Sequence, residues 1–116
     1  MMSILIDKLT DCGCHVQEAM GRFLNNEEFY EKCFVKYIND KSFDTLGEAI
    51  KAGDVKAAFG AAHDLKGISA NMGITPVYNQ VVDIVEDFRV GKIPDNALSV
   101  WEGILAQREK MKKIIE

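Results

Sequence analysis

The chain has 116 residues, of which 47% are hydrophobic, 28% are charged and only two are prolines. This length fits a single domain with its own core, and this composition excludes a disordered or fibrous protein. The formal net charge of −4 argues against non-specific binding to nucleic acid, because phosphate backbones attract basic surfaces.

The N-terminal residues and the cysteines indicate the compartment. The apolar start, MMSILI, is followed at once by Asp7 and Lys8, so it is too short for the core of a signal peptide and has no basic start. No run reaches the 18 or more apolar residues that roughly define a membrane span. An odd number of cysteines fits free thiols in a reducing compartment: Cys12, Cys14 and Cys33. We therefore expect a cytoplasmic protein.

Apolar residues recur at helical spacing through almost the whole chain, and no segment alternates apolar and polar residues as a strand would. The first short helix is predicted over about residues 2–10, with an apolar side made by Ile4, Leu5 and Leu9. A second short helix is predicted over about residues 16–23. Asn25 and Asn26 follow, and one of them is expected to cap the next helix.

The next segment, residues 27–53, has two apolar stripes separated by a polar interval at residues 39–42. That interval fits a kink, a break between two helices, or a solvated turn of one helix. Gly53 is predicted to end the segment in a left-handed conformation, and Asp54 to cap a helix over residues 55–72. So short a connection requires antiparallel neighbours.

Two more helices complete the chain. Thr75 is predicted as a cap with Pro76 at the first helical position, and that helix runs to about residue 90. The last helix is predicted over about residues 96–115 and is expected to bury Leu98, Trp101, Ile104, Leu105, Met111 and Ile115.

The predicted fold is all-α: an antiparallel up-down four-helix bundle over residues 26–116, with two short flanking helices in residues 1–25. The whole chain, residues 1–116, is then one domain. Met1 favours a complete small protein, and a domain excised from a hybrid kinase is the alternative.

Several kinds of site are not indicated. The glycines between Gly60 and Gly73 do not form a phosphate-binding loop, and the dinucleotide fingerprint is missing, so the chain has no recognisable ATP site and is not a kinase by itself. Cys12, Cys14 and His15 could hold part of a zinc site, but the usual spacing of paired ligands is absent. The alternative is a turn in which a cysteine packs as a small apolar residue.

His63 lies off the apolar stripe of the helix over residues 55–72, and its neighbours at helical spacing are Gly60, Lys66 and Gly67. Each glycine costs a helix roughly 1 kcal/mol relative to alanine, so two of them on one face suggest that something must approach closely. A histidine ring is mostly neutral at pH 7 and can act as a nucleophile. The pattern fits a phosphate-accepting histidine, with Lys66 as a cation for the phosphoryl group; a solvated or packed spectator is the alternative.

The string AHDLKGISANMG, residues 62–73, closely resembles the signature of histidine-containing phosphotransfer (HPt) domains. The signature has a histidine, a leucine two residues on, Lys-Gly immediately after, a small residue next but one, and a glycine ten residues after the histidine. The flanking helical segments also resemble those of the family, so the resemblance covers essentially the whole chain.

The resemblance implies a phosphorelay intermediate without a cofactor of its own. Nε2 of His63 would take a phosphoryl group from an aspartyl phosphate on a response-regulator receiver domain and return it to another receiver. Lys66 would be the phosphate-facing cation and Gly67 the residue that gives clearance, with Gly60 as a possible second clearance residue. The implied partners are receiver domains, which would supply Mg²⁺, and a hybrid sensor histidine kinase; no nucleic acid or membrane is implied.

One position departs from the family. Many members have a glutamine on the following helix, where this chain has Val85, so one hydrogen bond to the phosphoryl group would be lost. Gln80 is more than a turn away and is not a substitute. The alternative function is a non-catalytic helical module that docks receivers without phosphotransfer. In either case the docking surface would have Ile68 and Ala70 at its margins, with Met72 or Tyr78 as further candidates, and Ser69 would either orient the site or fill the core.

Overall fold

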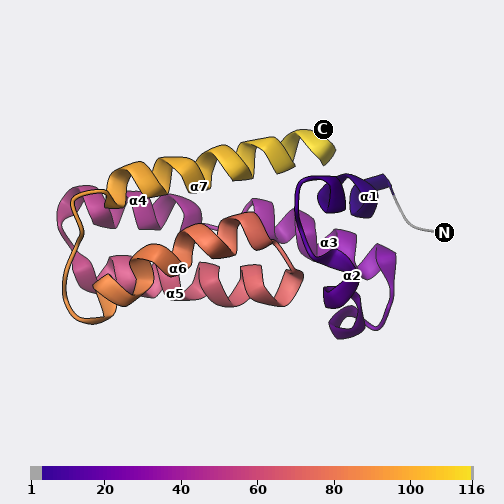
Figure 1. Ribbon diagram of the computed structural model, residues 1–116, viewed down its shortest axis with the longest axis horizontal. Coiled ribbons are helices and arrows are strands. Elements are labelled where there is room, and N and C mark those ends of the chain that lie inside the picture. Colours follow the sequence, from indigo (N-terminus) through magenta and orange to yellow (C-terminus); the bar gives the residue numbers. More distant parts are fainter. Residues whose placement is uncertain (1–3, 116) are drawn as a thin grey trace.

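The computed structural model describes residues 4–115, and this range contains helices and no strands. Four helices lie side by side along the long axis of an elongated molecule of 46 × 25 × 20 Å (Figure 1). They are α4 (Ser42–Ala52), α5 (Val55–Met72), α6 (Thr75–Arg89) and α7 (Ala97–Lys112). α5 packs against both α4 and α6, and α7 closes the bundle by packing against the same two helices. The predicted all-α four-helix bundle is confirmed.

The N-terminal helices gather at the end of the bundle where α5 passes into α6 (Figure 1). They are α1 (Ile4–Asp11), α2 (Val16–Ala19), the 3₁₀ helix η1 (Met20–Phe23) and α3 (Glu27–Ile38). The second predicted helix therefore changes type at Met20. The predicted start of the first helix, at Met2, lies outside the described residues. A last 3₁₀ turn, η2 (Lys113–Ile115), follows α7.

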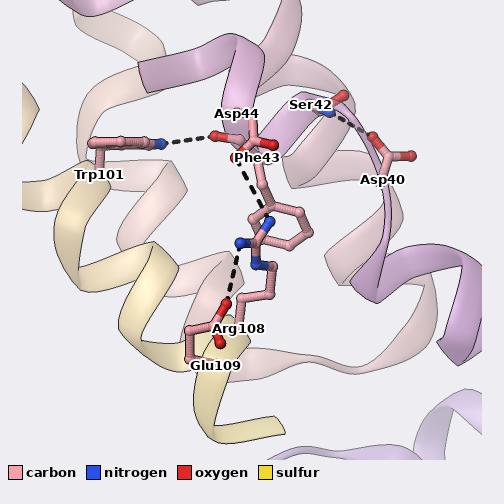
Figure 2. Close-up of polar contacts among 7 residues, drawn as sticks. All are labelled: Asp40, Ser42, Phe43, Asp44, Trp101, Arg108 and Glu109. Carbon is pink, nitrogen blue, oxygen red and sulfur yellow. Dashed lines mark hydrogen bonds and ion pairs between the residues drawn. The ribbon is translucent and has the colours of Figure 1, made fainter. Parts of the chain in front are cut away.

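Residues 39–41 separate α3 from α4, so of the three possibilities for this interval the break between two helices is correct. Asp40 stabilises this break: its Oδ1 accepts a hydrogen bond from the backbone N–H of Ser42 at 2.8 Å (Figure 2). Asn26 caps α3 as expected, since its side chain accepts a hydrogen bond from the Phe29 N–H. α3 and α4 then follow one another along the long axis.

The ends of α5 are the predicted ones. Gly53 ends α4 at φ 72°, and Asp54 caps α5 by accepting a hydrogen bond from the Ala57 N–H at 3.0 Å. Gly73, at φ 74°, ends α5 in the left-handed region that favours glycine.

The predicted cap of α6 is wrong by one residue. Ile74 occupies the N-cap position, and its carbonyl accepts the first helical hydrogen bond, from the Tyr78 N–H at 3.0 Å. Thr75 is already helical, with Pro76 in the first turn. The Ile74 side chain is buried in the core and makes no capping hydrogen bond.

Trp101 joins α7 to α4. Its Nε1 donates a hydrogen bond to the Phe43 carbonyl at 2.7 Å (Figure 2). Its ring covers Gly47 so closely that a Cβ at that position would clash with it. Only glycine therefore fits at this position, where α4 and α7 pack together.

Some residues predicted to be buried are exposed. Leu98 and Ile115 are each 38% exposed. Ile4, on the predicted apolar side of the first helix, is 72% exposed, whereas Ile6 is buried. Ile4 lies in the first turn of α1, Leu98 in the first turn of α7 and Ile115 at the end of η2. At such an end a helix has neighbouring elements on fewer sides. Within residues 4–115, no helix is both long and apolar enough to cross a membrane.

Candidate functional site

α5 turns one face to the core and the other to solvent. The core face consists of six buried residues: Ala58, Ala61, Ala62, Leu65, Ser69 and Met72. On the opposite face His63 and Asp64 are exposed, Gly60 and Gly67 are exposed as well, and Lys66 is half-buried. The residues that the sequence singled out therefore share the solvent side of a single helix.

Gly60 and Gly67 are not required by packing within the protein. A Cβ built at either position would meet no atom of the neighbouring elements, among the described residues, within 4 Å. Each glycine nevertheless costs the helix roughly 1 kcal/mol relative to alanine. The chain thus carries two helix-weakening residues beside His63 that its own structure does not explain, in contrast to Gly47 under Trp101.

A shallow hollow of about 280 Å³ lies beside His63, between α5 and the connection from α3 to α4. It is lined by Asp40, Ser42, His63, Asp64, Gly67 and Ile68. The hollow has two carboxylates at its edge and no lysine or arginine in its lining. An anionic group on His63 is therefore repelled on this side.

Lys66 follows His63 by three residues, so the two side chains are neighbours on the helix surface. Among residues 4–115, no carboxylate forms an ion pair with Lys66. Its charge is consequently available to an anion held at His63.

Val85 on α6 is fully buried. A buried aliphatic side chain offers no hydrogen bond, so this position contributes packing only. Gln80 does not replace it, because its amide points at α7: its Nε2 lies 2.8 Å from where a Cβ of Gly103 would be. Neither Val85 nor Gln80 is therefore placed to supply the hydrogen bond that the resemblance led us to look for on this helix.

Ser69 and Met72 belong to the core. Ser69 is fully buried, and its hydroxyl shares a 2.8 Å hydrogen bond with that of Tyr37. Burial raises the pKa of Tyr37 well above its ordinary value, and the Ser69 bond only partly offsets this. Met72 is only 3% exposed, so most of its side chain lies in the core. Ile68, half-buried, and Ala70, exposed, do lie at the surface of α5.

The N-terminal segment completes the C-terminal end of α5, a function that the sequence did not suggest. Arg22 donates from Nε to the Asn71 carbonyl at 2.8 Å and from Nη2 to the Ala70 carbonyl at 3.2 Å. The Tyr30 hydroxyl donates to the Met72 carbonyl at 2.7 Å. The last carbonyls of a helix accept no N–H from the regular helical pattern, and here side chains from outside the helix donate hydrogen bonds to them.

Cys12, Cys14 and His15 do not form a site together with other ligands. Cys14 is buried and Cys12 half-buried, while His15 is exposed with its Nδ1 3.9 Å from Glu18. No group of three or more potential metal ligands occurs in the described part of the chain. Burial, the largest cause, raises the pKa of the Cys14 thiol to about 11, as expected of a packed residue.

Comparison with known protein families identifies this arrangement. The model of the Hpt domain matches residues 39–110, from the break before α4 to near the end of α7. No curated protein and no solved structure matches the chain. Of the two histidines in the sequence, His15 lies outside the matched segment and His63 lies inside it.

Proposed function

Because the chain belongs to the Hpt domain family, we propose that His63 is the residue on which it carries a phosphoryl group. Membership of this family implies histidine phosphotransfer in a phosphorelay, and such a reaction needs a histidine that a partner can reach. One observation carries the assignment to His63: it is the single histidine of residues 39–110, and its side chain is exposed on α5.

The chemistry requires little of this protein beyond a positioned nucleophile. Nε2 of the neutral His63 ring attacks the phosphorus of an aspartyl phosphate on the receiver, and an N–P bond forms as the P–O bond breaks. The electron pair of the broken bond stays on the aspartate, which leaves as a carboxylate, and the ring keeps its proton on Nδ1. Transfer to a second receiver reverses these steps.

Lys66 and the two glycines have supporting roles in this proposal. Lys66, which forms no ion pair with the described residues, places a positive charge one turn from His63 and so offsets part of the negative charge of the phosphoryl group. Gly67, with Gly60 as a second position, leaves the volume that the phosphoryl group and the receiver occupy. The carboxylates of Asp40 and Asp64 disfavour movement of the phosphoryl group into the hollow.

Hpt domains interact with receiver domains in phosphorelays. We place the docking surface on the solvent side of α5 and on the adjoining surface of α3. Ile68 lines the hollow beside His63 and also a second, more apolar hollow of about 230 Å³. That second hollow is lined by Phe23, Cys33, Lys36, Tyr37, Asp40, Ile68, Asn71 and Met72. A hybrid kinase with a receiver domain of its own is the proposed donor, and the receiver is expected to supply Mg²⁺.

The proposal is tested by incubating the purified protein with a phosphorylated receiver domain and following the transfer of the label. We expect an acid-labile, alkali-stable phosphoprotein, which is the stability of a phosphohistidine. His63→Gln should abolish the label, and His15→Gln, the matched control, should leave it unchanged.

Label that persists in His63→Gln would exclude His63 as the acceptor. If no label forms on the wild-type protein although the receiver still binds, the chain acts as a docking module without phosphotransfer. In that case His63→Ala leaves regulation of the partner unimpaired.

A further inference from the structure

The imidazole of His63 has an aromatic neighbour one helical turn back. The rings of Phe59 and His63, both on α5, have centroids 5.5 Å apart and planes inclined at 42°. This separation lies in the range at which aromatic pairs attract one another. Phe59 is half-buried and packs against the core, whereas His63 is exposed, so the fixed ring is Phe59.

Phe59 is itself held from the neighbouring helix. The guanidinium carbon of Arg89, on α6, lies 5.0 Å from the centroid of the Phe59 ring, a cation–π distance. Arg89 is oriented in turn by Glu86, whose Oε2 is 3.1 Å from the Arg89 Nε. The contacts thus run from Glu86 through Arg89 and Phe59 to His63.

Of the two residues one turn before His63, only Phe59 has a side chain that can contact the His63 ring, because the other is Gly60. Side chains of a helix lean toward its N-terminus, so the His63 ring extends over the turn that contains Phe59 and Gly60. Gly60 has no side chain, and Phe59 provides the contact.

We propose that Phe59 is a positioning residue that fixes the orientation of the His63 ring for attack on the phosphoryl group, and that Arg89 holds Phe59 in place. The inference rests on the proposed function of His63. The χ2 angle of a histidine is broad and roughly two-fold, so an exposed imidazole samples orientations that point Nε2 away from the incoming phosphorus. A packed ring beside it favours one orientation, and in-line transfer is sensitive to such alignment.

The test uses Phe59→Leu, which removes the aromatic ring but keeps an apolar side chain, and Phe59→Tyr, which keeps the ring. The first readout is the NMR chemical shift of the His63 ring protons, which the neighbouring aromatic ring displaces. The second is the rate of phosphoryl transfer from a labelled receiver at saturating and at limiting receiver concentration.

We expect Phe59→Leu to move the His63 ring resonances and to slow transfer at saturating receiver concentration. The expected decrease in rate is about 3- to 10-fold, which corresponds to the energy of one aromatic contact. Phe59→Tyr should restore both readouts. Arg89→Gln alters an exposed side chain outside the core and should move the same resonances in the same direction by a smaller amount. The ring resonances of His15 are the internal control and should not move in any variant.

Unchanged His63 resonances in Phe59→Leu would overturn the inference. A loss of rate confined to limiting receiver concentration would overturn it as well, because it would assign Phe59 to docking. The NMR readout does not depend on phosphotransfer. A wild-type protein that accepts no phosphoryl group therefore refutes the proposed function, while the chemical shifts separately report whether the Phe59 ring lies beside that of His63.

Discussion

Replacing Gly67 or Gly60 by alanine should make the protein more stable. Neither Cβ would meet a neighbouring element within 4 Å, so the substitution introduces no clash with the described residues. Alanine is the better helix former by roughly 0.5–1 kcal/mol, because glycine loses more backbone entropy on folding. For a domain of this size that gain raises the midpoint of thermal unfolding by about 2–4 °C.

Gly47→Ala is the matched control, because it makes the same chemical change in another helix of the bundle. Its Cβ would clash with the Trp101 ring and displace the hydrogen bond from Nε1 to the Phe43 carbonyl. Overpacking costs about 1–3 kcal/mol and a lost hydrogen bond about 1 kcal/mol, against a helix gain of about 1 kcal/mol. The expected net effect is a loss of about 1–3 kcal/mol, opposite in sign to that at Gly67.

The assay is urea unfolding of the three variants, followed by far-UV circular dichroism, with phosphotransfer measured on the same samples. Gly67→Ala should be more stable than the wild type and yet slower by about 10- to 100-fold, because its methyl group enters the space through which the donor approaches. A Gly67→Ala variant that loses stability, or one that gains stability and transfers at the wild-type rate, would refute the clearance argument.

Three further predictions concern the packing around α5. Tyr37→Phe removes the hydrogen bond to the buried Ser69 hydroxyl and should cost about 1–3 kcal/mol of unfolding free energy in urea. Arg22→Ala removes the exposed bonds to the Asn71 and Ala70 carbonyls and should cost about 0.5–1.5 kcal/mol in the same assay. Stability should fall as the pH rises from about 9 to about 11. The unfolded Cys14 thiol ionises near 9.0, whereas burial raises its pKa to about 11 in the fold, so the folded state binds more protons in that window.

Each of these predictions has a control in the chain. Tyr78→Phe alters a half-buried tyrosine on α6 and should change stability by less than Tyr37→Phe does. Lys32→Ala removes an exposed ion pair with Glu28 and should be nearly neutral, so an equal loss in Arg22→Ala and Lys32→Ala would contradict the capping argument. Cys14→Ala should flatten the fall between pH 9 and 11, and an unchanged slope would show that other groups cause it.

The boundaries of α5 could be predicted because they depend on local chemistry. Asp54 as a cap and the glycines at both ends act within a few residues of their own positions, and periodicity identified the buried face. The exposure of His63 followed from the same periodicity. The cap of α6 was misplaced because a buried Ile74 occupies the position that usually favours a polar residue.

The contacts that complete the site could not be predicted from the sequence, because they join distant segments. Arg22 and Asn71 are 49 residues apart, and nothing in the composition around Arg22 indicates that its guanidinium meets backbone carbonyls. Arg89 lies in the last turn of α6, where a basic residue is common. Its position over the Phe59 ring depends on how α5 and α6 pack, which periodicity does not specify.

The contacts between the N-terminal segment and α5 also set the order in which the protein can assemble. Arg22 and Tyr30 leave the ribosome before the carbonyls they bind, at Asn71 and Met72, which follow 49 and 42 residues later. At a synthesis rate of roughly 5–20 residues per second, the segment waits roughly two to ten seconds for its partners. The part of the chain that is made first therefore reaches its final contacts only after the histidine-bearing helix has been synthesised.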